Sequence, residues 1–366
     1  GNYIMCFIIK SIYDVHDIKS EWSKVVKATS YAWFWSEYYE HCFRLITLEK
    51  KRVLVKDKSF FIYDKQKNLC GLVPLVFIES NNYKGIEACY DKPLPWPMIM
   101  EHAKNNTLIV EFIFSKIDEL LNNDNVKKIS WQYSPPDCDN NFSKIFTEAM
   151  REYRYIENSY MAHYVSISSE TLDRIRKRYK RYVKKYINAY SLSIIDRANI
   201  DMDIVKEYME LHIKDSGAFH RPLETYIAQF DFVVQDDGFI VQANDNKTGN
   251  IVGMLLISVN KKAAYDGSVA VDPNHQQYYV SHLMKWQAIQ YLIDIDVKYY
   301  ELGEVSESSS YLRQPSKKNY GISFFKDGWS RGKMKKTIVY EKYFSKSALN
   351  EFCNKKIHEL NNFFEI

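Results

Sequence analysis

The chain has 366 residues and a formal net charge of +4, so its surface as a whole is close to neutral. An anionic partner would therefore have to be met by a local patch of cations rather than by the whole molecule. Hydrophobic residues make up 46% of the sequence and aromatic residues 15%, which indicates a globular protein and excludes disorder over most of the length. The length predicts two domains of about 150 to 200 residues each.

The cysteines and the lack of long apolar runs bear on the cellular compartment. None of the six cysteines has CxxC or other metal-type spacing, which indicates buried thiols in a reducing environment. The opening YIMCFII has only seven apolar residues and no cleavage pattern after it, so it predicts a strand rather than a signal peptide. No segment approaches the roughly 20 apolar residues of a membrane span, and we expect a cytoplasmic protein.

The predicted elements follow a similar order twice along the chain. Two helices within 17–43, broken near Thr29 and Ser30, precede the first copy, which has strands within 58–80 and 84–100, a helix at 107–121 and a strand at 125–131. After a strand within 154–168 and a helix at 171–187, the second copy has strands within 237–260 and 262–273, a helix at 281–293 and a strand at 296–302. A strand at 335–345 and a helix at 348–364 end the chain. Antiparallel strands followed by one helix and a further strand form an α+β unit, so we expect two such units in tandem.

The helix predicted at 171–187 is the strongest charge feature. Eight of the twelve residues from Arg174 to Lys185 are Lys or Arg, while Tyr179, Tyr182 and Tyr186 fall on one apolar stripe at steps of three and four. One interpretation is a solvated cationic face. The other, favoured by the density of cations, is a site for a phosphate-bearing substrate or an RNA backbone.

Several segments together carry a resemblance to a known family. They are the basic helix RIRKRYKRYVKKY, the stretch YMELHIKDSGAFHRPLETY at 208–226, the strand pair around IVGMLLISVNKKAAYDGS, the strand YYELGEV and the closing ISFFKDGW. In this order they resemble the FemAB family and its relatives, which are tandem acyltransferases of the GNAT (Gcn5-related N-acetyltransferase) superfold. The resemblance is weak in the first half and better from about residue 165 to 335. It implies an α+β fold of two tandem GNAT-like domains, residues 3–160 and 161–366, each a mixed, mainly antiparallel sheet flanked by helices.

The most specific element of the resemblance is a Phe-Lys-x-x-aromatic-Gly motif. Here it reads Phe325, Lys326 and Trp329, with Ser330 where glycine is usual and Gly332 two residues further on. Members of the family move an aminoacyl group from a charged tRNA to an amine of a peptidoglycan precursor, and relatives act on other envelope or glycan intermediates. The resemblance therefore implies an amide-forming acyltransferase in which Lys326 stabilises the negative charge that develops at the attacked carbonyl. The alternative for Lys326 is a surface lysine whose stem lies on an aromatic patch.

The resemblance implies further roles. Phe325, Trp329, Arg178 and Arg181 would bind the donor, and Arg221, Tyr226 and His220 would bind a phosphate-bearing or glycan acceptor. Candidate proton acceptors for the incoming amine are Asp266 on AYDGS and Glu304 or Glu301 at the end of a strand. His212 and His220 are each more often structural than catalytic.

The donor is left open between aminoacyl-tRNA and acyl-CoA, neither as a tightly bound cofactor. GNAT enzymes that use acetyl-CoA have a glycine-containing turn whose backbone N–H groups reach the pyrophosphate at a helix N-terminus. The corresponding segment here, DPNHQQYYVSHLM at 272–284, contains no glycine and places Tyr278 and Tyr279 at the cradle, which favours aminoacyl-tRNA. Against this, no coiled-coil insertion of the kind that some tRNA-using members have is present.

Two alternative functions remain. One is an acetyl-CoA-dependent N-acetyltransferase acting on an amino sugar or similar small amine, and the other is a GNAT-fold binding module that has lost its chemistry. The sequence contains no HExxH, GxSxG, Walker or GxGxxG motif, so metallohydrolase, serine hydrolase and nucleotide-phosphate enzymes are disfavoured and no metal is expected. It does not indicate an oligomeric state.

Overall fold

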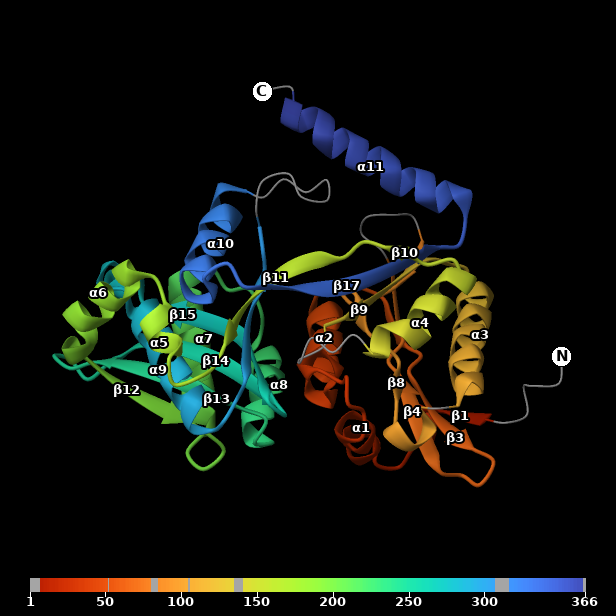
Figure 1. Cartoon of the computed structure of the whole chain (residues 1–366), viewed down its shortest axis with the longest axis horizontal. Coiled ribbons are helices and arrows are strands. Elements are labelled where there is room, and N and C mark those ends of the chain that lie inside the picture. The colour runs from red at the N-terminus through yellow and green to blue at the C-terminus, as the bar shows by residue number, and fades with distance from the viewer. Residues whose placement is uncertain are drawn as a thin grey trace. The chain divides into compact units, whose positions relative to one another are not determined.

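A computed structural model describes residues 7–51, 53–79, 85–104, 106–134, 141–306 and 316–364 (Figure 1). Contacts group the described residues into two compact units: one holds those up to Tyr160 and those from Lys336 onward, and the other those between Met161 and Lys335. The predicted division into residues 3–160 and 161–366 stays a prediction. The compact units differ from it in placing the last strand and helix with the first unit.

The first unit is built on strands that form two sets. Their order is β1-β3-β4-β8 in one set and β17-β9-β6-β5-β2 in the other, with β7 beside β9 and β10 beside β17. The bounds of the strands are β1 Phe7–Ser11, β2 Val55–Asp57, β3 Phe60–Asp64, β4 Leu69–Val73, β5 Val76–Glu79, β6 Ile86–Ala88, β7 Leu94–Pro95, β8 Met98–Ile99, β9 Val126–Tyr133, β10 Ile156–Glu157 and β17 Met334–Tyr343. The helices are α1 Ile18–Lys27, α2 Tyr38–Lys50, α3 Thr107–Asn123, α4 Asn141–Glu152 and α11 Lys346–Phe364.

Alternation along β3 explains how the first unit buries both faces of its sheet. Phe60 and Ile62 lie in the core cluster that contains the buried face of α3, whereas Phe61 lies in the cluster around Trp22 of α1. Side chains of a strand point alternately to opposite faces, so a run of apolar residues such as KSFFIYD predicts a strand covered on both sides. The two helices expected within 17–43 are present as α1 and α2, whereas α4 was not predicted.

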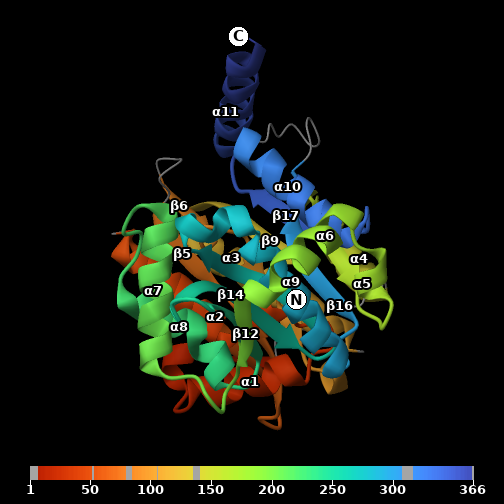
Figure 2. The same cartoon turned by 90° about the vertical axis from the view of Figure 1, so that its left-hand side faces the viewer.

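The second unit has one mixed sheet in the order β12-β13-β14-β15-β16-β11. The pairing is antiparallel except between β15 and β16, which run parallel. The strands are β11 Tyr160–Ser166, β12 Tyr190–Ile195, β13 Gly238–Asp245, β14 Ile251–Asn260, β15 Ala263–Val271 and β16 Tyr299–Glu304. The helices are α5 Thr171–Arg174, α6 Lys177–Tyr186, α7 Met202–Ser216, α8 Leu223–Val234, α9 Val280–Asp294 and α10 Lys317–Ser330. Figure 2 shows α7 and α8 on one side of the strands and α5, α6 and α9 on the other.

β15 and β16 separate after a short paired stretch. Ala263–Tyr265 pair with Tyr299–Glu301, and beyond them no further pair joins the two strands in the part of the chain that the structure describes. We call this point, with Tyr265 and Asp266 on β15 and Gly303 and Glu304 on β16, the strand fork. A β-bulge follows at Gly267, because Ile257 lies opposite Asp266 and Leu256 opposite Ser268. The bulge turns Asp266 toward α9 and Ser268 toward α7, since an extra residue shifts the alternation of side chains.

The single helix predicted at 171–187 is wrong in one respect, because the structure has two helices there. Ile175 and Arg176 leave the helical conformation between α5 and α6. The backbone N–H of Arg176 donates instead to the carbonyl of Gly328 in α10 at 2.9 Å. The break therefore ties the start of α6 to the helix that carries Lys326.

Candidate active site

Lys326 lies at the strand fork. Its Nζ donates to the backbone carbonyl of Glu304 at 3.4 Å, and a Cβ added to Gly303 would come within 3.2 Å of the same nitrogen. Gly303 has a φ of +91°, which L side chains rarely adopt, so its conformation favours glycine, and a Cβ there would also displace the end of the Lys326 side chain slightly. Burial lowers the pKa of Lys326, while the carboxylate of Asp266 opposes that shift. A half-buried ammonium is thus held between the diverging strands.

The aromatic neighbours of Lys326 in the sequence lie elsewhere. Phe325 and Trp329 belong to a cluster with Tyr179 and His282, and none of these rings lies within cation–π distance of Lys326 among the described residues. Adjacent residues of a helix point about 100° apart, so Phe325 faces the cluster while Lys326 faces β16. The sequence placed the lysine among rings, whereas the structure places it against backbone.

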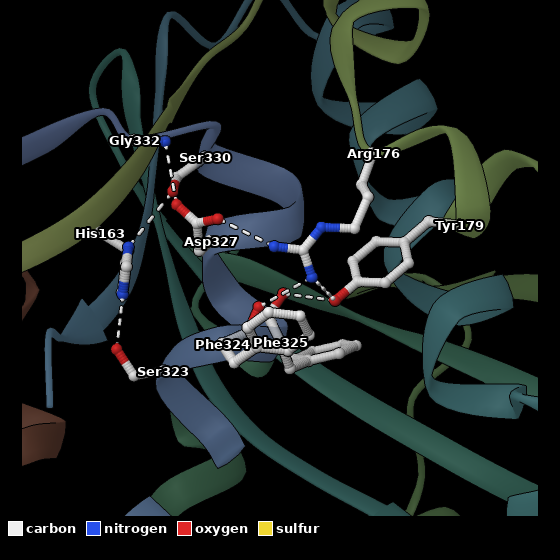
Figure 3. A network of polar contacts seen from close by, with 9 residues as sticks. All are labelled: His163, Arg176, Tyr179, Ser323, Phe324, Phe325, Asp327, Ser330 and Gly332. Carbon is white, nitrogen blue, oxygen red and sulfur yellow. Dashed lines mark hydrogen bonds and ion pairs between the residues drawn. The ribbon is translucent and has the colours of Figure 1, made fainter. Parts of the chain in front are cut away.

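A network of polar contacts holds α10 in position (Figure 3). Arg176 forms an ion pair with Asp327 at 2.9 Å and donates to the carbonyl of Phe324 at 3.2 Å. The Tyr179 hydroxyl donates to the carbonyl of Phe325 at 3.1 Å. The guanidinium of Arg176 also lies over the Phe324 ring at 4.1 Å. Phe324, Phe325 and Asp327, which make these contacts, flank Lys326 in the sequence. The contacts therefore hold the turn of α10 that carries Lys326 and set the direction of its side chain.

His163 of β11 holds the other side of α10. Its Nε2 lies 2.9 Å from the Ser323 hydroxyl and its Nδ1 lies 3.2 Å from that of Ser330. The imidazole is buried, and its burial, with a smaller contribution from the charge of Lys326, lowers the pKa of His163 to about 4. Near neutral pH it is therefore an uncharged link between β11 and α10.

This burial predicts acid sensitivity. The pKa of His163 is about 4 in the folded chain and ordinarily 6.5. As the pH drops from 6.5 toward 4, the unfolded chain therefore takes up a proton that the folded chain does not, and the free energy of unfolding falls. The full contribution is on the order of 3 kcal/mol. Burial lowers the pKa of His282 to about 4 as well, so it adds a loss over the same window. Urea unfolding across this pH range should show a smaller fall for His163→Gln than for the wild type, and equal falls in both proteins would contradict the assignment.

A second buried network adjoins the fork on the α9 side. Lys285 donates to Asp266 at 2.6 Å, and the Tyr300 hydroxyl donates to the other carboxylate oxygen of Asp266 at 2.8 Å. Lys285 and Tyr300 are fully buried. Both oxygens of Asp266 are therefore engaged. Lys326 lies close to this network and to Glu304, so the fork brings together two ammonium groups and two carboxylates.

The glutamates of β16 differ in their surroundings. Glu301 is buried and forms an ion pair with buried Lys335 at 2.6 Å. The Glu304 side chain is exposed, and its backbone carbonyl is the atom that accepts from Lys326. Lys285 was not singled out from the sequence, because its partner Asp266 lies on a different element. The Arg176–Asp327 pair was not singled out either, since nothing local indicates that residues about 150 positions apart meet.

Among the residues proposed to bind a donor, Arg178 and Arg181 are exposed on α6. Trp329 is 1% exposed and lies in the core, so it can support Phe325 but offers no surface to a ligand. Lys177, Lys184 and Lys185 are also exposed on α6. None of these five cations has a carboxylate within ion-pair distance in the part of the chain that the structure describes.

Tyrosines cover the start of α9. Tyr279, at the residue before the helix, has a φ of +59° and stacks on Tyr182 of α6 with centroids 3.6 Å apart. Tyr186 meets Tyr278 edge to face at 5.7 Å. The turn expected to correspond to a pyrophosphate cradle thus packs on α6 through its two tyrosines, and His282 lies against the rings of Tyr179 and Phe325.

The residues proposed to bind an acceptor lie together around α7 and α8. The Arg221 guanidinium lies 4.0 Å from the centroid of Tyr226, which is buried and bonds His212 Nδ1 through its hydroxyl at 2.7 Å. His220 lies 6.0 Å from His212, centroid to centroid. Burial, then the charge of Arg221, lowers the pKa of His212. Tyr208 bonds Ser268 of β15, which links this cluster to the strand that forms the fork.

Comparisons with known proteins bear on the fold. No protein-family model and no curated protein matches the sequence. A solved structure of FemX is similar with a TM-score of 0.65 at 10% identity, over 90% of this chain and 97% of that one. The chain has the fold of FemX. The predicted FemAB-like fold class, α+β with mixed sheets flanked by helices, is confirmed.

Two further solved structures share this fold. The C-terminal domain of a lysylphosphatidylglycerol synthetase from Agrobacterium fabrum has a TM-score of 0.55 at 8% identity, over 90% of this chain and 93% of that one. L-PGS from Bacillus licheniformis has a TM-score of 0.52 at 10% identity, over 80% and 87%. At such identities the likeness extends to the fold and not to an activity or a substrate.

No helix within the described residues is both long enough and apolar enough to cross a bilayer. No group of three or more His, Cys, Asp or Glu side chains is arranged to hold a metal ion among those residues.

Proposed function

We propose that this chain is an amide-forming N-acyltransferase of the FemAB-like type whose reaction takes place at the strand fork. The observation that carries the proposal is the Lys326 ammonium, held against Gly303 and the Glu304 carbonyl where β15 and β16 part. A fixed positive charge in a partly desolvated site stabilises a developing oxyanion far better than one in water, because no reorganisation is needed during the reaction. The FemX fold supports the same class of chemistry.

In the proposed reaction the acceptor amine attacks the carbonyl carbon of the donor ester. The new N–C bond pushes an electron pair onto the carbonyl oxygen, and Lys326 stabilises that oxyanion. Collapse of the intermediate breaks the C–O bond to the donor, whose hydroxyl leaves with a proton, while the amine nitrogen gives up a proton to a base. Glu304 and Asp266 remain the proposed bases. Because both oxygens of Asp266 already accept hydrogen bonds, we favour a charge-balancing role for it between Lys285 and Lys326.

Aminoacyl-tRNA is the donor that we propose. The turn before α9 carries Tyr278 and Tyr279, packed against tyrosines of α6, in place of the glycines that let backbone N–H groups approach a CoA pyrophosphate, and this supports a donor other than CoA. The exposed cations of α6, which have no carboxylate partner among the described residues, offer sites to a polyanionic backbone. Arg178 and Arg181 would contact the donor in this arrangement, and Phe325 would support it from the aromatic cluster.

We further propose a phosphate-bearing envelope or glycan precursor as the acceptor. Arg221, stacked on Tyr226 beside His220, is the cation that would meet its phosphate. A lysylphosphatidylglycerol synthetase, by its name, forms a product in which an aminoacyl group is joined to a phosphate-bearing acceptor, and it shares this fold. That neighbour supports the class of acceptor and leaves its identity open.

Calorimetric titration with acetyl-CoA tests the choice of donor. We expect no saturable heat with acetyl-CoA and saturable binding of charged tRNA. Lys326→Ala should give the same results as the wild type, because Lys326 acts on the transition state rather than on the bound donor. Micromolar binding of acetyl-CoA, about −8 kcal/mol, would contradict the proposal and favour the alternative of a CoA-dependent N-acetyltransferase. An inactive binding module, the other alternative, predicts that Lys326→Ala changes no function.

A further inference from the structure

A cavity of about 550 Å³ opens in the first unit beside β1 and β2. Ile9 of β1, Val55 of β2 and Leu120 of α3 form apolar parts of its wall. These three side chains pack against the core cluster of the unit and stay only half-buried, so their outer faces meet the cavity. Small-molecule sites are concave, about 300 to 1,000 Å³ in volume, and combine apolar walls with a few polar groups. The cavity has the size and the walls of such a site.

Two lysines line the same cavity and are loosely paired. The Nζ atoms of Lys56 and Lys58 each lie 3.7 Å from the carboxylate of Asp124, the residue after α3. That distance is longer than a hydrogen bond, and neither ammonium has a closer acceptor in the part of the chain that the structure describes. The two lysine side chains are 48% and 39% exposed. Both ammonium groups can therefore donate to a ligand.

The carboxylate among the lining residues is turned inward. The Asp57 side chain is 4% exposed, and its two oxygens bond His41 Nε2 at 2.7 Å and the backbone N–H of Ser59 at 3.0 Å. His41 Nδ1 in turn lies 2.6 Å from the Tyr90 hydroxyl. Donors of the protein thus satisfy Asp57, while the two lysines on either side of it lack close acceptors among the described residues. The charge that the described lining presents to a ligand is therefore positive.

We propose that this cavity binds a small organic anion with an apolar body, whose carboxylate or phosphate group lies on Lys56 and Lys58. Hydrogen bonds from an ammonium to an anionic oxygen are stronger than those between neutral groups. The apolar body would cover the outer faces of the walls and remove further apolar surface from water. A cation would instead face two positive charges, and a neutral ligand would make no use of them. The cavity contains no residue of the strand fork, so this proposal does not depend on the proposed transfer reaction.

Fluorescence titration of the full chain with 8-anilino-1-naphthalenesulfonate tests the proposal. This probe joins one anionic group to aromatic rings and fluoresces strongly when it leaves water. We expect saturable binding to the wild type, and binding weakened about tenfold or more in Lys56→Met with Lys58→Met, because both charge-assisted contacts are lost. N-phenyl-1-naphthylamine, which has the same rings without the sulfonate, should bind the wild type and this variant alike.

Two further variants control for charge and for the cavity itself. Lys262 and Lys298 of the second unit both donate to Asp296 and are exposed, so Lys262→Met with Lys298→Met removes the same charge at another place and should bind the probe like the wild type. Leu120→Trp narrows the cavity and should weaken binding although both cavity lysines are present. Thermal unfolding of Lys56→Met with Lys58→Met should be nearly unchanged, since loose pairs at the surface contribute little to stability.

Competition for the bound probe identifies the anionic group. Phenylacetate and phenyl phosphate carry the same ring and differ in the anionic group, so the one that displaces the probe at lower concentration shows whether the site prefers a carboxylate or a phosphate. Benzylamine, a cation of similar size, should not displace the probe. Its displacement of the probe as readily as the two anions would overturn the proposal.

Two results of the titrations would overturn it as well. One is the absence of saturable binding by the wild type, or equal binding by the wild type and the double lysine variant. The other is an equal loss of both probes in the double lysine variant, which would mean that the lysines maintain the shape of the cavity rather than bind an anion.

Discussion

Replacing Lys326 by alanine is expected to lower kcat for acyl transfer by about 10²- to 10³-fold, with little change in KM. The loss is the size expected when one fixed donor to an oxyanion is removed, and it falls on kcat because the oxyanion exists only in the transition state. Single-turnover transfer from the bound donor measures it directly. Lys318→Ala, which removes an exposed lysine from the same helix, is the control and should retain the wild-type rate.

Replacing Lys326 by methionine, which removes the charge but keeps a long side chain, should not destabilise the fold. Burial lowers the pKa of Lys326, so the folded chain holds this proton less tightly than the unfolded chain. Protonated Lys326 therefore costs stability at neutral pH, and that cost disappears as the pH rises toward the ordinary value of 10.5. Lys326→Met should raise the midpoint of thermal unfolding at pH 7 while lowering the transfer rate by about 10²- to 10³-fold. A variant that loses both stability and activity would show that the lysine serves the packing of α10 instead.

The sequence predicted many of the elements where local patterns are strong, and it missed β12, α4, α7, α8 and α10. The short apolar runs of β3 and β4, and the apolar stripes of α3 and α9, each follow from a dozen or so neighbouring residues. The break between α5 and α6 could not be predicted in this way. It depends on Arg176, whose partners Gly328 and Asp327 lie about 150 residues further along the chain.

The candidate site was predicted in part for the same reason. The motif around Lys326 identified the residue but not the helix that carries it, and the direction of its side chain depends on the fork between β15 and β16 and on Gly303. In the sequence, Lys285 cannot be distinguished from a surface lysine of an amphipathic helix. Its pairing with Asp266 becomes visible only when the bulge at Gly267 turns that carboxylate toward α9. Roles for Arg221, Tyr226 and His220 stay predictions, although the structure brings the three together.

Two glycines of α10 should respond to alanine in opposite ways. A Cβ at Gly328 would lie 2.0 Å from a ring atom of Tyr179, which is buried, whereas one at Gly321 meets nothing within 4 Å. We expect Gly328→Ala to destabilise the protein by about 3 kcal/mol, because α10 or the Tyr179 ring must move. Gly321→Ala should instead stabilise it by about 0.5 to 1 kcal/mol, since alanine has the higher helix propensity. Urea unfolding of the two variants measures both changes on one helix.

The consequence for function follows from what Gly328 holds. Its close approach to Tyr179 lets the carbonyl of Gly328 accept from Arg176 and lets Tyr179 reach the carbonyl of Phe325, the residue before Lys326. If this contact positions the lysine, Gly328→Ala should lower the transfer rate even at temperatures where the protein stays folded, while Gly321→Ala should not. Tyr179→Leu, which removes the ring atoms in the way, should then cost less in the Gly328→Ala background than in the wild type. If the losses caused by Gly328→Ala and Tyr179→Leu add up, the contact between Gly328 and Tyr179 does not position Lys326. Its position would then depend on the contacts of α10 with His163 and β16.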